Sequence, residues 1–291
     1  MRVALISDIH GNLPALQSVL ADIDARTTVT GTLHLGDLVG YAPWPNEVVS
    51  LLRERGINGV AGNYDSTVAT TYEHCGCRYE DPRQEALAHE SYAWTLAHTS
   101  DAVKRWLGAL PFSLTVRADG GHKSGAKLVL VHGTPVLNTA YWHEDRDDDF
   151  CRRMAETAQL RSGDLIAFGH THKPWTRVVD GIRFVNTGSV GRPKDGDPRA
   201  GYVIVTHDAA GWQVEFVRVP YDVEGAAAAI TVPPASSTAL IASREESPVV
   251  TTSSMSNIFC PGSSRNPRRR PKIPSGRSTN IASTPSARPI S

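Results

Sequence analysis

Apolar and polar positions alternate along the first sixty residues in a way that predicts three strands and two helices. Short apolar, β-branched runs predict strands at Arg2–Ile6, Thr32–Leu35 and Ile57–Ala61. Apolar residues recur at three- and four-residue spacing over Leu13–Ile23 and Pro45–Arg55, which predicts two helices. This strand–helix–strand–helix–strand order predicts parallel strand pairing with right-handed crossovers.

The same pattern continues to about residue 220. Helices are expected over residues 82–110 and Asp148–Leu160. Further strands are expected where apolar runs lie between turn residues, at Phe112–Arg117, Lys127–Val131, Leu165–Phe168, Thr176–Val179, Arg183–Val185, Tyr202–Thr206 and Gln213–Val219. Asp180-Gly181 predicts a hairpin turn. We therefore expect an α/β fold in which two sheets pack together with helices outside them.

The composition changes after about Ala226. Residues 226–291 are rich in Ser, Thr, Pro and Arg, and they contain too few apolar side chains to offset the entropy of ordering the chain. We therefore predict one domain over residues 1–225 and a disordered tail over residues 226–291. The tail carries eight basic and two acidic residues, so the overall net charge of zero leaves the domain at −6. An acidic domain argues against nucleic acid as a partner.

The four cysteines do not form the framework of a disulfide-rich protein. Cys75 and Cys77 are separated by one glycine, which is poor spacing for a disulfide and differs from a zinc knuckle. The N-terminus lacks the pattern of a signal peptide, and no apolar run reaches the roughly 18 residues of a membrane helix. We expect a cytoplasmic protein with reduced thiols and no membrane partner.

Seven residues whose side chains are of types that commonly bind metals follow the predicted strands. They are Asp8, His10, Asp37, Asn63, His132, His170 and His172. Because ligands gather beyond the carboxyl ends of strands in α/β sheets, these residues can converge on one site. Two carboxylates, one amide and four imidazoles suit a pair of borderline divalent metals.

The motifs around these residues are DxH, GDxxG, GNxD, HG and GHTH, and they occur in this order. The order resembles the calcineurin-like metallophosphoesterase superfamily, and in particular its small bacterial phosphodiesterase-like branch, over roughly residues 1–220. The resemblance implies a four-layer α-β-β-α sandwich with two mixed β-sheets flanked by helices. It also implies two bound divalent metal ions, with manganese as the first choice and iron, zinc or nickel as alternatives.

The resemblance further assigns a role to each ligand. Three residues would hold the first metal: Asp8, His10 and His172. Three others would hold the second metal: Asn63, His132 and His170. Asp37 would bridge the two ions, and a hydroxide shared between them would attack the phosphorus atom.

The family often has a histidine after the asparagine of GNxD, and that histidine is proposed to protonate the leaving group. This chain has Tyr64 at that position, between Asn63 and Asp65, and these three residues are the catalytic candidates. A phenol is a poorer acid than imidazolium at neutral pH. Tyr64 therefore donates weakly, or the leaving group needs little help, or a water serves; Asp65 is expected mainly to orient the loop.

Two residues are predicted to contact the substrate. Asn12 follows the DxHG turn and could donate to a phosphate oxygen, although it could equally cap the helix that follows. Arg192 lies in a loop of small residues and could bind an anion, although it could also be an exposed loop arginine. The segment from Cys75 to Cys77 could cover the site as a lid.

We therefore predict dinuclear-metal-dependent hydrolysis of a small phosphorylated substrate, either a phosphodiester or a phosphomonoester. A non-catalytic scaffold with the same fold is one alternative, and a protein phosphatase or nuclease is another. The filled ligand positions favour an enzyme. The sequence does not determine the oligomeric state.

Overall fold

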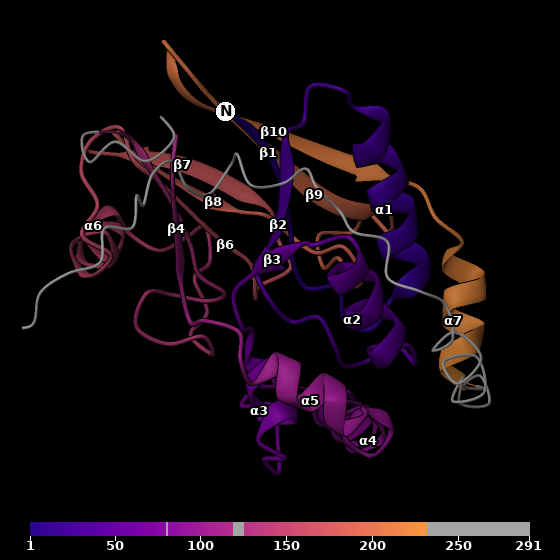
Figure 1. The fold of residues 1–291 in the computed structure, drawn as a ribbon. Coiled ribbons are helices and arrows are strands. Elements are labelled where there is room, and N and C mark those ends of the chain that lie inside the picture. The colour runs from indigo at the N-terminus through magenta and orange to yellow at the C-terminus, as the bar shows by residue number, and fades with distance from the viewer. Residues whose placement is uncertain (80, 119–124, 232–291) are drawn as a thin grey trace, which may run out of the picture. The chain divides into compact units, whose positions relative to one another are not determined.

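The computed structural model describes residues 1–79, 81–118 and 125–231, so the predicted tail lies almost wholly outside the described residues. Within these described ranges, ten strands form two five-stranded sheets (Figure 1). In spatial order, the first sheet contains β10 (Gly211–Val219), β9 (Ala200–Asp208), β1 (Arg2–Ile6), β2 (Gly31–His34) and β3 (Asn58–Gly59). The second sheet contains β4 (Leu114–Arg117), β5 (Lys127–Leu130), β6 (Leu165–Phe168), β8 (Ile182–Asn186) and β7 (Trp175–Val179).

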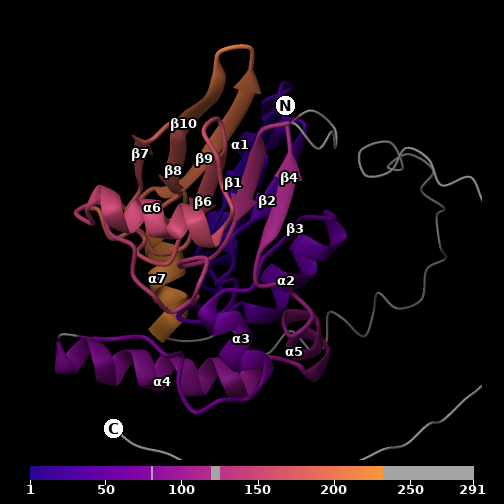
Figure 2. The same cartoon turned by 90° about the vertical axis from the view of Figure 1, so that its left-hand side faces the viewer.

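Seven helices accompany these strands in the described part of the chain. They are α1 (Leu13–Ala25), α2 (Pro45–Glu54), α3 (Asn63–Ala69), α4 (Pro82–His98), α5 (Asp101–Leu107), α6 (Asp148–Thr157) and α7 (Val223–Thr231). Helices α1 and α2 lie beside the first sheet, and α6 covers the second (Figure 2). Helices α3, α4 and α5 gather at one end of the domain in both views. Among the described residues, no helix is long and apolar enough to cross a membrane.

The two-residue period of β1 explains how the layers stack. Val3 and Leu5 belong to the apolar cluster that both sheets share, whereas Ala4 and Ile6 point the other way, into the cluster that contains the buried residues of α1 and α2. A third cluster joins the outer face of the second sheet to α6 through residues such as Cys151. These three apolar layers between four structural layers confirm the predicted α-β-β-α sandwich.

Parallel pairing places the functional loops at one edge. Strands β1, β2 and β3 are parallel neighbours in the first sheet, and β5, β6 and β8 are parallel neighbours in the second. The parallel order predicted for the first three strands is confirmed. Since the strands within each set end on the same side, the loops that follow them meet at one edge of the sandwich.

The hairpin predicted at Asp180-Gly181 is confirmed, because β7 and β8 pair antiparallel across it. Both turn residues have positive φ, +50° and +76°, which is the conformation that a type I′ turn requires. The strand predicted at Ile57–Ala61 pairs only at Asn58 and Gly59. It is shortened because the amide of Ala61 turns away to the carbonyl of Pro111, 2.9 Å from it.

Residues 82–110 are mainly helical, as predicted. They form two helices, because the Ser100 hydroxyl accepts a hydrogen bond from the Val103 amide and caps the start of α5. Helix α3 was not predicted, since within its seven residues only Tyr64 and Val68 are buried apolar side chains. The predicted domain boundary at residue 225 falls inside α7, which runs from Val223 to Thr231.

Candidate metal centre

The structure brings all seven predicted metal ligands together, and every one is at least 95% buried. Each lies in a loop that follows a strand, or, in the case of Asn63, at the start of α3 directly after β3. Six of them form two groups whose ligand atoms lie within 4.8 Å of one another. The first group is Asp8, His10 and His172, and the second is Asp37, His132 and His170.

The ligand atoms of the first group lie close to one another. His172 Nε2 lies 3.2 Å from Asp8 Oδ1 and 3.1 Å from His10 Nε2. Asp8 and His10 are two residues apart in the loop after β1, while His172 comes from the loop after β6. The two sheets therefore each contribute to this group.

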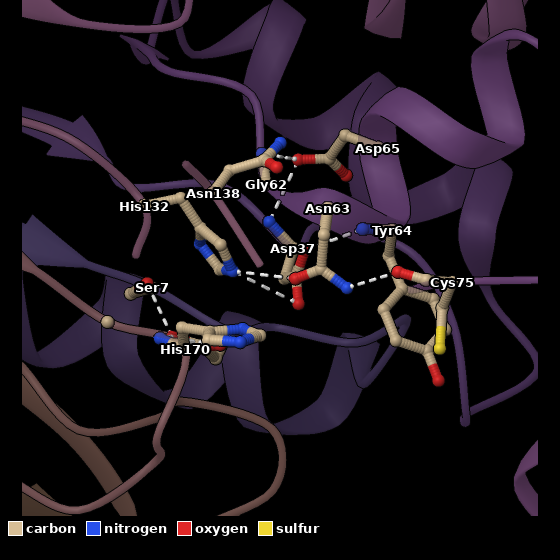
Figure 3. Close-up of polar contacts among 12 residues, drawn as sticks. Ser7, Asp37, Gly62, Asn63, Tyr64, Asp65, Cys75, His132, Asn138 and His170 are labelled. Carbon is tan, nitrogen blue, oxygen red and sulfur yellow. Dashed lines mark hydrogen bonds and ion pairs between the residues drawn. The ribbon is translucent and has the colours of Figure 1, made fainter. Parts of the chain in front are cut away.

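The second group includes the amide that the sequence predicted. His132 Nε2 lies 3.1 Å from Asn63 Oδ1 and 3.3 Å from Asp37 Oδ2. Figure 3 marks both contacts with dashed lines. The same oxygen of Asp37 lies 3.7 Å from His10 Nε2 of the first group. The carboxylate of Asp37 is therefore placed between the two groups, as a bridging ligand must be.

Backbone carbonyls fix which nitrogen each imidazole presents to the site. The Nδ1 atoms of three rings face carbonyls: His10 faces Val39 at 3.2 Å, His132 faces Leu35 at 2.8 Å and His172 faces Arg192 at 2.6 Å. His170 uses Nε2 instead, 3.2 Å from the carbonyl of Thr139. Because a carbonyl only accepts, the facing nitrogen carries a proton, and a neutral ring turns the lone pair of its other nitrogen into the site.

This arrangement fits metal ions on chemical grounds. With Nδ1 of both rings protonated, the Nε2 lone pairs of His10 and His172 face each other at 3.1 Å, beside the carboxylate of Asp8. Electron-rich atoms at this distance repel unless a cation or proton lies among them. A set of carboxylate, amide and imidazole donors suits borderline divalent ions. The residues present therefore fit a divalent metal at each group.

Burial and charge set the protonation of these ligands. Burial lowers the pKa of His10 to about 3 and that of His170 to about 4, so both rings are neutral at pH 7. Burial opposes ionisation of Asp8, but the imidazoles of His172, His132 and His10 together outweigh burial and hold the pKa of Asp8 well below its usual range. Burial also disfavours protonated His132, yet the carboxylate of Asp37 raises the His132 pKa to about 10. A metal ion entering the second group would displace that proton.

Backbone strain is concentrated at the same residues. Nine non-glycine residues of the described chain have positive φ, and five of them are predicted ligands: Asp8, His10, Asp37, His170 and His172, with φ between 50° and 65°. Left-handed conformations are unfavourable for such residues and persist where the surroundings enforce them, which is typical of functional sites.

Polar groups outside the ligand set hold the loops in place. The Ser7 hydroxyl donates to Asp8 Oδ2 at 2.6 Å, and the Ser189 hydroxyl donates to the Asp8 carbonyl at 2.7 Å. The Asn186 side chain donates to the Gly169 carbonyl at 2.8 Å and supports the GHTH loop. None of these three side chains was predicted as part of the site, although Ser7 and Asn186 stand at strand ends beside the motifs.

The three catalytic candidates have different surroundings. Asn63 contributes to the second group, as described above. Asp65 accepts hydrogen bonds from the amides of Asp37, Leu38 and Gly62 at 2.8–2.9 Å, so it joins the loops after β2 and β3. Burial, together with the nearby charge of Asp37, raises the pKa of Asp65 to about 7.

Tyr64 is packed among aromatic rings. Its ring meets His10 at 5.2 Å and Tyr92 at 5.7 Å, both edge-on, and it lies 5.2 Å from Tyr41. Within the described residues its buried hydroxyl has no hydrogen-bond partner. Burial raises the pKa of Tyr64 well above 10, which makes this phenol a still weaker acid than the sequence suggests.

The two predicted substrate contacts also differ. Asn12 caps α1, since its Oδ1 accepts from the Ala15 amide, and its Nδ2 donates to the Gly191 carbonyl and the Tyr221 hydroxyl. Its hydrogen-bonding groups are thus already engaged. The guanidinium of Arg192 lies 4.1 Å from the centre of the Tyr41 ring, and no carboxylate pairs with it in the described part of the chain. Tyr41 in turn lies 4.8 Å from His10.

The segment from Cys75 to Cys77 lies against the second group. Asn63 Nδ2 donates to the Cys75 carbonyl at 2.8 Å and contacts Cys77 Sγ at 3.3 Å. Cys75 is buried and Cys77 is half-buried. The segment therefore borders the predicted ligands, as a covering segment would.

Two sheets packed between helices, with buried carboxylates and imidazoles at their strand ends, define the class of metal-dependent phosphoesterases. Comparison with known families agrees: residues 1–210 match the calcineurin-like phosphoesterase superfamily domain. The chain belongs to this superfamily and is an enzyme of the phosphoesterase class.

Individual relatives support the same assignment. The chain is 32% identical to an uncharacterised protein, MJ0912, of Methanocaldococcus jannaschii, across 77% of this chain and 89% of that protein. It is 26% identical to the phosphodiesterase YfcE of Escherichia coli K12, across 72% and 89% of the two chains. The crystal structure of a metallophosphoesterase from Sphaerobacter thermophilus superposes with a TM-score of 0.61 at 28% identity, covering 80% of this chain and 93% of that one.

Proposed function

We propose that this protein hydrolyses a phosphate ester with the help of two divalent metal ions, and that a phosphodiester is its first substrate class. The observation that carries the proposal is the position of Asp37. Its Oδ2 lies 3.3 Å from His132 Nε2 in one group and 3.7 Å from His10 Nε2 in the other. One carboxylate shared by two groups of buried donors is the arrangement that a two-metal phosphoesterase requires.

The metals and the residues have separate tasks in this proposal. When bound, two divalent ions would polarise the phosphate and lower the pKa of the attacking water. Backbone carbonyls orient the Nε2 atoms of His10, His132 and His172 into the site, so the chain holds these nitrogens in position before any ion arrives. The loops also place the ligands in a fixed relative position, and such positioning lowers the entropic cost of the reaction.

Arg192 would bind the phosphate group. Arg192 is half-buried as a residue, and its guanidinium lies over Tyr41 with no carboxylate partner among the described residues. A guanidinium can donate two parallel hydrogen bonds to phosphate oxygens, which fixes the orientation of the ester as well as its charge. Asn12 keeps a supporting role, since it holds the Gly191 carbonyl next to Arg192.

The leaving group departs without a dedicated protein acid. Tyr64 is buried in an aromatic cluster, its pKa is raised well above 10, and its ring packs on His10. Such a site suits a substrate with a good leaving group, or a substrate whose leaving group is protonated by water. The similarity to a protein named as a phosphodiesterase supports diesters as the first class to test.

Manganese is the metal we propose, with iron, zinc and nickel as alternatives, since carboxylate, amide and imidazole donors suit all four. A cytoplasmic location and a small phosphorylated substrate complete the proposal. A screen of these metals against a panel of phosphorylated metabolites would rank both metal and substrate.

Asp37→Asn tests the function directly. The variant removes the charge that both groups share, so turnover of bis(p-nitrophenyl) phosphate with Mn²⁺ should fall by at least about 100-fold, the upper end of what losing even a supporting partner of a metal ligand costs. Asp24→Asn is a matched control, because Asp24 is 54% exposed and, among the described residues, pairs only with Arg55 on the surface. The control should keep turnover within about twofold.

The same assay decides between the enzyme and its alternatives. Turnover that survives both EDTA and Asp37→Asn would contradict a two-metal mechanism. Absence of turnover of both the diester and p-nitrophenyl phosphate would favour a non-catalytic scaffold. Preference for a phosphopeptide or an oligonucleotide over small esters would favour a protein phosphatase or a nuclease.

A further inference from the structure

The Cys75-Gly76-Cys77 turn controls the orientation of a proposed metal ligand. Asn63 presents Oδ1 to His132 Nε2 at 3.1 Å, and its Nδ2 donates to the Cys75 carbonyl at 2.8 Å (Figure 3). The same Nδ2 also lies 3.3 Å from Cys77 Sγ. An amide has one oxygen end and one nitrogen end. Because the turn holds the nitrogen end, the oxygen end faces the second group.

The turn also supports a second ligand of that group. Gly76 has φ +74°, and a Cβ placed on it would lie 3.0 Å from Thr139 Cγ2, so the turn packs directly on Thr139. The Thr139 carbonyl is the acceptor that faces His170 Nε2 at 3.2 Å. A change in the conformation of the turn therefore reaches both Asn63 and His170.

The two cysteines approach each other within this turn. The left-handed conformation of Gly76 folds the chain back, and the Cys77 amide donates to Cys75 Sγ at 3.4 Å. Cys77 is half-buried, so a small oxidant can reach it, whereas Cys75 is only 4% exposed and lies behind it as a second thiol. Both are free thiols in this structure.

We propose that Cys75 and Cys77 are a peroxide-sensitive modification site that forms a reversible disulfide and thereby weakens metal binding at the second group. The inference rests on the proposed two-metal function. Formation of the bond would draw Cys77 Sγ away from Asn63 Nδ2, leave that amide held at one point only, and distort the turn that packs on Thr139.

The chemistry balances with peroxide as the oxidant. The sulfur of one cysteine, as its thiolate, attacks one peroxide oxygen and the O–O bond breaks; that cysteine becomes a sulfenic acid, and the other oxygen leaves as water with the proton of the thiol. The sulfur of the second cysteine then attacks the sulfenic sulfur, the S–S bond forms, and the hydroxyl leaves as a second water with the remaining thiol proton. Two thiols are oxidised by two electrons, and one hydrogen peroxide is reduced to two waters.

The short spacing between Cys75 and Cys77 makes the proposed disulfide easy to reduce, so its formation is reversible. A single residue between two cysteines forces the disulfide away from its preferred geometry, and such strained disulfides are readily reduced. A reducing compartment would therefore keep the thiols apart and the site intact. Peroxide would form the disulfide, and a dithiol would reduce it again.

The test compares three proteins before and after treatment with hydrogen peroxide. Wild type is compared with Cys75→Ser, which lacks the second thiol but keeps the backbone carbonyl that holds Asn63. Cys151→Ala is the control for a buried cysteine elsewhere, in the cluster under α6. Each protein is measured by peptide mass under non-reducing conditions, by bound Mn²⁺ per chain, and by diester turnover.

Wild type and Cys151→Ala should yield a peptide containing residues 75–77 that is about 2 Da lighter, lose about half of their bound Mn²⁺ and lose turnover at least about tenfold. Dithiothreitol should restore all three readouts. Cys75→Ser should form no such peptide and keep its Mn²⁺. Absence of the lighter peptide in wild type would overturn the inference, as would its formation with Mn²⁺ content unchanged, or an equal loss of Mn²⁺ from Cys75→Ser.

Failure of the proposed function gives a different result. A reduced wild-type protein that binds Mn²⁺ but turns over no ester would contradict the phosphoesterase proposal, while peptide mass and Mn²⁺ content would still test the thiol pair. Turnover in the reduced protein without any response to peroxide would leave the function standing and overturn only the inference.

Discussion

At the scale of single residues, the imidazole rings show how backbone geometry prepares a side chain for metal binding. Four rings face four carbonyls, and the same loops hold five ligands at positive φ. Neither feature is encoded in the motif itself, because the carbonyls of Val39, Leu35 and Arg192 come from loops distant in sequence. The local pattern predicts which residues bind, and long-range contacts determine which nitrogen does so.

Tyr64→Phe tests the role of the phenol. Because this hydroxyl is buried without a partner in the described structure, removing it should leave kcat/KM within about twofold and leave the free energy of unfolding equal or up to about 1 kcal/mol higher. Tyr92→Phe is the matched control, since its hydroxyl donates to the Tyr72 carbonyl at 2.9 Å and its loss should destabilise by about 1 kcal/mol. A tenfold fall in kcat for Tyr64→Phe, with a changed pH profile, would show that the phenol takes part in catalysis.

The substrate contacts show where residue-level prediction reaches its limit. Asn12 and Arg192 both lie in loops beside motifs, and the sequence offered two roles for each. The structure engages Asn12 in a helix cap and in a bond to Gly191, whereas it leaves the Arg192 guanidinium over Tyr41 without a carboxylate partner among the described residues. Tyr41 carries no signal in the sequence, because its proximity to Arg192 arises only from folding.

At the scale of elements, strand ends were predictable because short apolar runs stop where the polar motifs begin. β1 and β6 have the predicted bounds. Helix α3 was missed because it is one of the shortest, and its capping residue Asp65 was seen mainly as part of a motif. That aspartate has two structural roles: it accepts from the amide of Gly62, the residue that precedes α3, and it holds the loop that carries Asp37.

Asp65→Ala tests this link between an element and the site. Three buried amides would lose their acceptor, so the free energy of unfolding should fall by about 3 kcal/mol, and turnover should fall because Asp37 is no longer fixed. Asp101→Ala is the matched control, because Asp101 is also acidic and in the first turn of a helix but is exposed. It should change stability by about 0.5 kcal/mol or less. Urea unfolding and diester turnover would check both, and a stable, active Asp65→Ala would contradict the role.

At the scale of the whole molecule, two sheets contribute different halves of one site. The first sheet supplies Asp8, His10 and Asp37, and the second supplies His132, His170 and His172. Their shared apolar layer, which contains Leu5 and Leu128, fixes the sheets against each other and so fixes the distance between the groups. The sandwich could be predicted from the alternation of strands and helices. The relative placement of the two sheets, which brings Asp37 between the two groups, could be seen only in the structure.

The central claim is a centre of two metals bridged by Asp37, and anomalous diffraction from crystals grown with Mn²⁺ tests it most directly. We predict two manganese peaks about 3.5–4 Å apart on either side of the Asp37 carboxylate. One should lie against Asp8, His10 and His172, and the other against Asn63, His132 and His170. A single peak, or two peaks that do not share Asp37, would contradict the account.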